Sequence, residues 1–170
     1  MANSYSNYTI IRVTPTLDTN AYAQGDVLFV ATEIPNAVLG NGGCSKLIGM
    51  YMLNQNLTDV DVDFIFSENS AVFGSINATA NISDSTIEAA NVTGFLHLDS
   101  NIGTTSAIDT AEIKRVSDIG AGDGNSQVPP ILIQAAAGST SVYVVGILTG
   151  SPTPTYAADD IDLILHIQYS

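Results

Sequence analysis

Hydrophobic and polar residues alternate along residues 59–66, which read DVDVDFIF. The apolar positions on one side of this alternation are Val60, Val62, Phe64 and Phe66. Successive side chains of a β-strand point to opposite faces, so the pattern predicts a half-buried strand whose aspartates face water. We expect the apolar face to pack against the inner side of residues 46–53 or of the C-terminal strand.

Eight further segments carry a strand pattern, either as alternation or as a continuous apolar run. They are residues 8–14, 26–31, 46–53, 95–99, 107–116, 131–135, 142–149 and 161–168. A short connection through Gly138 separates residues 131–135 from residues 142–149, which predicts a hairpin. Gly49, inside an otherwise apolar run, indicates a bulge or a close approach of the backbone.

Residues 86–93 carry the clearest helix signal. Ser85 and Glu88 fit a capping box, in which each side chain accepts a hydrogen bond from the other residue's backbone amide. Gly94 stands where a glycine commonly ends a helix. The side chains that we expect to face the core are Ile87, Ala89 and Ala90.

Nine short strands separated by turn signals, with one short helix, predict an all-β fold. The expected architecture is an antiparallel β-sandwich or jelly roll of about eight or nine strands. The chain has 170 residues, which favours a single domain over residues 1–170. Residues 1–7 are small and polar except for Tyr5, so we interpret them as a candidate mobile arm.

The charge of the chain excludes some partners. It has 17 acidic and four basic residues, with a net charge of −13. Such a chain repels phosphate groups, so we expect neither nucleic acid nor an anionic membrane surface as a partner. Charged residues make up only 12% of the chain, about half the usual share. Low charge with much Ser, Thr and Asn is typical of β-rich proteins with limited solvent exposure or many partner contacts.

The N-terminal residues contain neither a basic region nor an apolar segment of a secretory signal. No apolar run reaches the roughly 18–20 residues that cross a bilayer. A single cysteine, Cys44, allows no disulfide within the chain. These features predict synthesis and folding in a cytoplasm, or a chain from which a signal has been removed.

Two acidic clusters are candidate cation sites. Asp59, Asp61 and Asp63 resemble the start of a calcium loop, but Phe64 stands where that loop needs glycine. Carboxylates two apart on a strand lie about 7 Å from each other, so we interpret them as a solvated face. The second cluster precedes the last strand and is interpreted as an acidic strand entry; it contains Asp159, Asp160 and Asp162.

Enzymatic candidates are sparse. His97 and His166 both fall in predicted strands, and no nucleophile motif accompanies them. Two histidines are too few for a zinc site made of histidines alone. Cys44 lies in a glycine-rich stretch near Lys46, and we interpret it as an ordinary thiol. The residues therefore predict a non-enzymatic protein with no cofactor.

Residues 14–28 read TPTLDTNAYAQGDVL, residues 34–37 read IPNA, and residues 150–156 read GSPTPTY. This pattern resembles small virion structural proteins encoded near the head genes of tailed bacteriophages, which are capsid decoration or cement proteins. The resemblance covers about the first 40 and the last 40 residues, and it contains no catalytic motif.

The resemblance implies a homotrimer on the outer capsid surface, with the major capsid protein as its partner. Such proteins hold neighbouring capsid subunits together against the pressure of the packaged DNA. We expect the segment from Tyr5 to Arg12 to lie on a neighbour as an added strand. The candidate subunit or capsid contacts are Tyr5, Tyr8, Ile10 and Arg12.

Two other functions remain open. A carbohydrate-binding or receptor-binding module of a phage fibre or tail would present an exposed loop aromatic. The chain has no Trp, and Tyr22 and Tyr156 are the obvious loop aromatics. A hydrolase on a jelly roll would need a pocket in which His97 or His166 meets a carboxylate.

Overall fold

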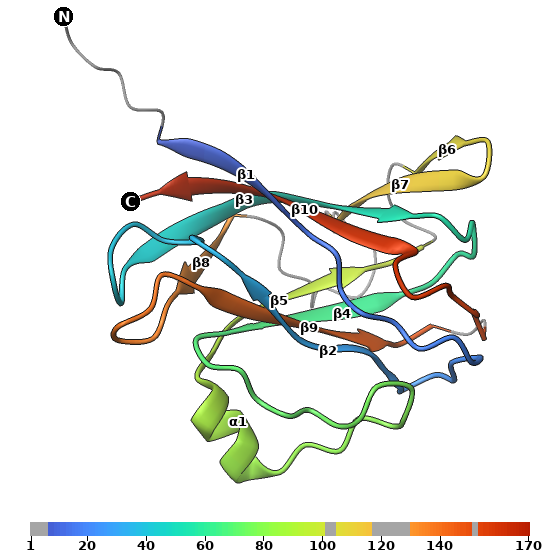
Figure 1. The fold of residues 1–170 in the computed structure, drawn as a ribbon, viewed down its shortest axis with the longest axis horizontal. Coiled ribbons are helices and arrows are strands. Elements are labelled where there is room, and N and C mark those ends of the chain that lie inside the picture. The colour runs from blue at the N-terminus through green and yellow to red at the C-terminus, as the bar shows by residue number, and fades with distance from the viewer. Residues whose placement is uncertain (1–6, 101–104, 117–129, 151–152) are drawn as a thin grey trace, which may run out of the picture.

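The chain folds into two β-sheets packed face to face (Figure 1). The computed structural model describes residues 7–100, 105–116, 130–150 and 153–170. The six-stranded sheet contains β1 (Tyr8–Val13), β3 (Cys44–Asn54), β6 (Thr105–Ile108), β7 (Ala111–Val116), β8 (Ile131–Gln134) and β10 (Ile161–Tyr169). The four-stranded sheet contains β2 (Val27–Ile34), β4 (Val62–Ser67), β5 (Val92–Leu98) and β9 (Val142–Leu148). The predicted all-β antiparallel sandwich is thus confirmed.

Every pair of neighbouring strands is antiparallel. The order in the larger sheet is β1-β10-β3-β7-β6, and β8 pairs with the other end of β3. The order in the smaller sheet is β2-β9-β4-β5. The predicted hairpin of residues 131–135 with residues 142–149 is wrong, because β8 and β9 belong to different sheets. Their connection passes from one layer of the sandwich to the other.

The inner faces of the two sheets form the main core. Val60, Val62, Phe64 and Phe66 are fully buried in it, as the alternation predicts. They share this core with residues of β3 and β10, namely Leu47, Met50, Met52, Leu163 and Leu165. The strand itself begins at Val62 rather than at Asp59, because residues 57–61 make no sheet ladder.

Residues 107–116 form parts of two strands rather than one. β6 and β7 make an antiparallel hairpin in which Ile108 pairs with Ala111. Asp109 lies at the turn with a φ of 53°, a left-handed conformation that aspartate adopts more readily than most residues. This turn raises the count to ten strands within the described residues.

The helix, α1 (Asp84–Ala90), lies two to three residues earlier than predicted. Ser83 is its N-cap, and its hydroxyl accepts a hydrogen bond from the Thr86 amide (3.2 Å). Asn91 ends the helix in a left-handed conformation with a φ of 49°. Gly94 is part of β5, where an added Cβ would lie 2.7 Å from the Ile131 side chain. Ala90 is buried, whereas Ile87 and Ala89 are exposed, so their predicted burial is wrong.

Candidate functional site

One outer face of the sandwich is covered by other segments of the chain, and within the described residues the other is not. On the four-stranded sheet, residues 68–83 and α1 lie across the outer face (Figure 1). They bury a second apolar cluster of Val27, Phe73, Ala90 and Val145. On the six-stranded sheet, no described segment covers the corresponding face, which we call the open face.

Large apolar side chains lie on the open face. Ile10 is 65% exposed, Leu132 is 62% exposed and Tyr8 is 58% exposed. These residues come from opposite edges of the sheet, because β1 and β8 lie on either side of β10 and β3. Most apolar side chains of the sheet alternate inward and are buried. The exposed ones are outward-facing side chains of the open face.

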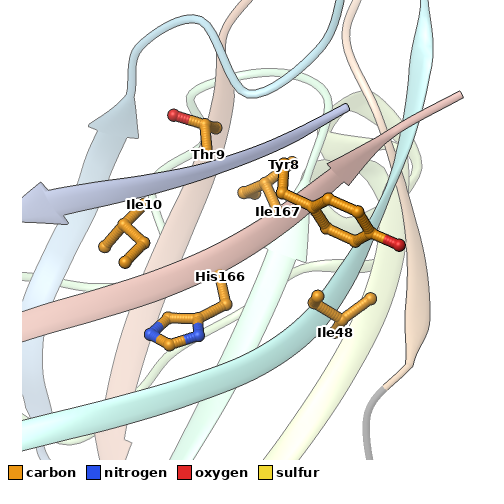
Figure 2. A pocket seen from close by; sticks show the side chains of 6 residues that line it. All are labelled: Tyr8, Thr9, Ile10, Ile48, His166 and Ile167. Carbon is orange, nitrogen blue, oxygen red and sulfur yellow. The ribbon is translucent and has the colours of Figure 1, made fainter. Parts of the chain in front are cut away.

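A hollow of about 340 Å³ lies in the open face near β1 and β10. Figure 2 shows the residues that line it, which are Tyr8, Thr9, Ile10, Ile48, His166 and Ile167. Gly49 pairs with His166 and has no side chain to fill the space between β10 and β3. The register shifts beside this pair, and the resulting bulge leaves Ile48 exposed. Of the two alternatives predicted for Gly49, a bulge or a close approach of the backbone, the register shift beside it supports the bulge.

The register of the strands aligns side chains into rows across the open face. One row runs Arg12, Ile164, Tyr51 and Arg115, since directly opposed residues share one face of a sheet. A second row runs Tyr8, Gln168, Lys46 and Leu132. Three of the four basic residues of the chain therefore lie on this face. The sequence predicts which side chains of a single strand face outward. It does not predict which of them lie side by side on neighbouring strands, because that depends on the strand register.

Arg12 is held by a buried carboxylate. Its guanidinium donates to Asp162, which also accepts a hydrogen bond from the Thr14 hydroxyl. Burial by itself would raise the pKa of Asp162, but the hydrogen bonds from Arg12 and Thr14 and the charge of Arg12 outweigh burial and lower that pKa. The same pairing raises the pKa of Arg12. Lys46 and Arg115 have no ion-pair or hydrogen-bond partner within the described residues, so their charges remain available.

The first acidic cluster is divided among three partners. Asp59 accepts from the buried ammonium of Lys114 (2.7 Å), Asp61 from the amide of Ser100 (2.7 Å), and Asp63 contacts Nδ1 of His97 (2.6 Å). The predicted solvated face is therefore wrong for Asp61 and Asp63, which are only partly exposed. Within the described residues, no group of three His, Cys, Asp or Glu side chains is placed to hold a metal ion.

The second acidic cluster also divides. Asp160 accepts a hydrogen bond from the amide of Ala157 (2.6 Å) and closes a turn. Asp159 is exposed, and its carbonyl accepts from the Gln55 side chain (3.3 Å). Asp162 belongs to the pair with Arg12. These are structural roles at the entry to β10.

Lys114 is part of a buried polar cluster that sequence patterns did not reveal. It is 1% exposed, and its ammonium lies 3.2 Å from Glu112 as well as 2.7 Å from Asp59. The carboxylate of Glu112 also accepts from the side-chain amide of Asn54 (2.8 Å). Each buried charge thus has an opposite charge beside it, which buried ions require. Glu112 and Lys114 alternate with apolar residues in β7, a pattern that by itself indicates outward side chains.

The two histidines lie in different sheets and do not form one site. His97 in β5 contacts Asp63 in β4. His166 in β10 lines the hollow, and its ring lies 5.3 Å from that of Tyr51. The histidine that meets a carboxylate is therefore not the one in the hollow.

Tyr22 and Tyr156 are core residues. They are 1% and 2% exposed, and their rings meet edge to face with centroids 5.9 Å apart. Burial raises the pKa of both phenols. The expectation that they are exposed loop aromatics is wrong, because the loops that carry them fold into the end of the sandwich.

The predicted contact residues lie together where the structure describes them. Tyr8, Ile10 and Arg12 are on β1, with their side chains on the open face. Their strand pairs with β10 of the same chain, so these residues already belong to a sheet. Tyr5 and most of the candidate arm lie outside the described residues. Cys44 is exposed at the start of β3 rather than in a loop.

Within the described residues, no helix is both long and apolar enough to cross a membrane. Comparisons with protein-family models, with curated proteins and with solved structures find no match.

Proposed function

We propose that this chain is a non-enzymatic structural protein of a bacteriophage virion. It decorates the outer surface of the capsid and stabilises the capsid by bridging neighbouring capsid subunits. Its partner is the major capsid protein, and it acts as a homo-oligomer, which we expect to be a trimer. It is synthesised in the host cytoplasm and needs neither a cofactor nor a disulfide.

The observation that carries this proposal is the open face. Protein interfaces combine an apolar centre, depleted in charge, with a polar rim. On this face, Ile164 and Tyr51 provide apolar surface between Arg12 and Arg115, which stand at the two ends of the row. Ile10, two residues before Arg12 on β1, adds further apolar surface. The rest of the chain is strongly acidic. A protein surface with carboxylates around an apolar centre is the complementary partner.

Phage heads made with and without the protein test this function. Heads that lack it should release their DNA at a lower temperature, as measured with a DNA-binding dye, and adding the purified protein should restore the release temperature. Heads of equal robustness in both preparations would exclude the cement role.

Charge reversal tests the open face itself. The double variant Lys46→Glu with Arg115→Glu should fold normally, because both side chains are exposed, and should fail to sediment with heads. A matched control reverses two exposed carboxylates elsewhere, Glu88→Lys with Asp159→Lys, and should still bind. Equal binding of both double variants would place the contact on another surface.

The alternative function is a carbohydrate-binding or receptor-binding module of a fibre or tail. The exposed Tyr8 beside the hollow favours it, since aromatic side chains in concave sites bind sugars and small ligands. The burial of Tyr22 and Tyr156 weighs against it. Binding on a glycan array that is lost in Tyr8→Ala would favour this module over the decoration protein.

A further inference from the structure

β1 is an edge strand with an unpaired side. It ends the six-stranded sheet, and its only strand partner among the described residues is β10. The amide of Tyr169 donates to the carbonyl of Asn7 (2.8 Å). Hydrogen-bonded and non-bonded pairs alternate in an antiparallel ladder, so Thr9, Ile11 and Val13 bond to β10. The backbone N–H and C=O groups of Ile10 and Arg12 therefore point to the open edge of the sheet.

Such an edge is a template for another strand, and proteins usually block it. The common blocks are proline, a bulge, a covering segment or several charges. β1 reads YTIIRV, with one charge and no proline, and its register with β10 is unbroken. No described segment pairs with its free side.

The sequence of β1 is complementary to itself in the antiparallel direction. If Ile10 is placed opposite Ile10 of a second copy, Arg12 comes opposite Tyr8 of that copy, and Tyr8 opposite its Arg12. Ile10 then forms a bonded pair, because its N–H and C=O both point to the edge. A guanidinium beside an aromatic ring is favourable, and no like charges are directly opposed.

The charge distribution also favours this approach. Two chains that each carry a net charge of −13 repel each other over most of their surfaces. β1 has no carboxylate, and Asp162 on the neighbouring strand β10 forms an ion pair with Arg12. The edge of β1 is thus a place where a second copy meets little repulsion.

We infer that two copies of this chain pair through β1, antiparallel and centred on Ile10, about a two-fold axis perpendicular to the sheet. The six-stranded sheets of the two copies then continue into each other. Because opposed residues share one face of a sheet, both open faces point in the same direction. A two-fold contact does not close a trimer, so in a trimeric assembly it joins one trimer to the next. This inference stands independently of the proposed function.

Opposite charges at Ile10 test the pairing. Ile10→Asp and Ile10→Lys each place two like charges together at the two-fold axis, so each variant should sediment as a monomer where the wild type is a dimer. A mixture of the two should recover dimers that contain one copy of each. Ile10 is 65% exposed, so both variants should fold and keep the wild-type circular dichroism spectrum.

Three further variants distinguish pairing through the β1 edge from non-specific association. Ile10→Pro removes the N–H that points to the edge, at a position where an edge strand tolerates proline. It should abolish dimers while leaving the bonds of Thr9 and Ile11 to β10. Val72, which is 75% exposed on the segment over the other sheet, provides the control pair Val72→Asp and Val72→Lys, which should leave the dimer unchanged.

The measurement is sedimentation equilibrium over the full range of soluble concentrations at physiological salt. Dimers, or larger assemblies of an even number of chains, that dissociate in the single variants and reform in the mixture support the pairing. A wild type that stays monomeric, or a trimer that none of the Ile10 variants changes, overturns it. So does a mixture of Ile10→Asp and Ile10→Lys that fails to associate.

Discussion

The hydroxyl groups of two buried tyrosines are satisfied to different degrees. Tyr22 accepts a hydrogen bond from the Asp18 amide (2.6 Å) and donates one to the Leu28 carbonyl (3.1 Å). The hydroxyl of Tyr156 has no hydrogen-bond partner among the described residues. A buried polar group without a partner keeps its desolvation cost and gains nothing in return.

Removing each hydroxyl should therefore have different effects. Tyr22→Phe should lower the free energy of unfolding by about 1–2 kcal/mol, because the Asp18 amide loses its acceptor. Tyr156→Phe should leave the free energy of unfolding unchanged or raise it slightly. Urea unfolding of the two variants gives the comparison, and equal losses would mean that the Tyr156 hydroxyl does have a partner.

The pair of Arg12 and Asp162 should make stability depend on pH. The pKa of Asp162 is lowered in the folded chain, so its contribution is present above its usual pKa of about 3.9 and is lost as pH falls through the folded value. Arg12→Met should reduce the melting temperature near neutral pH, and the difference from wild type should close in acid. Arg115→Met, an exposed arginine with no partner among the described residues, should show no such dependence.

At the scale of elements, alternation predicts which segments are strands, but not how they pair. Val60, Val62, Phe64 and Phe66 lie on the predicted inward face, because a period of two is a local property. The opposite side of this segment is partly covered rather than solvated, which depends on contacts with distant residues. The hairpin predicted for residues 131–135 and 142–149 is wrong for another reason. A short connection can either close a hairpin or cross from one sheet to the other, and the packing of the core determines which of the two forms. The helix starts early because Ser83, rather than Ser85, reaches the Thr86 amide.

The same limit applies to the candidate site. Tyr8, Ile10 and Arg12 were predictable as one outward face, since they alternate within one strand. Lys46 and Arg115 were not, because their place on that face depends on the register of β10, β3 and β7. The burial of Lys114 depends on Asp59, which is far away in sequence.

The two sides of the segment around β4 should respond differently to substitution. Phe64→Asp puts a charge into the centre of the core, where Phe64 is fully buried, at a cost comparable to the whole stability of about 5–15 kcal/mol. We expect no cooperative melting transition in this variant. Asp61→Asn keeps the oxygen that accepts from the Ser100 amide, so it should change the free energy of unfolding by less than about 1 kcal/mol. A cooperative transition in Phe64→Asp would contradict the assignment of this core.

At the scale of the whole molecule, the distribution of charge should give the melting temperature and the proposed attachment to phage heads opposite dependences on salt. The net charge of −13 makes the folded chain repel itself, and salt screens this repulsion. Raising the salt concentration should therefore increase the melting temperature by about 2–4 °C, equivalent to about 1 kcal/mol at this size. Under the proposed function, attachment to phage heads should instead weaken, because salt would screen the attraction between the partner's carboxylates and Lys46, Arg115 and Arg12.

The charge-reversed double variant, Lys46→Glu with Arg115→Glu, sharpens this comparison. It raises the net negative charge, so its melting temperature should increase more steeply with salt than that of the wild type. Under the proposed function, its attachment to heads should be lost at low salt and should not weaken further as salt is added, because the two introduced glutamates would repel the carboxylates of the partner. A wild-type melting temperature that falls with salt would mean that surface ion pairs outweigh the repulsion between carboxylates. Attachment that strengthens with salt would mean that the apolar side chains of the open face, rather than its cations, hold the partner.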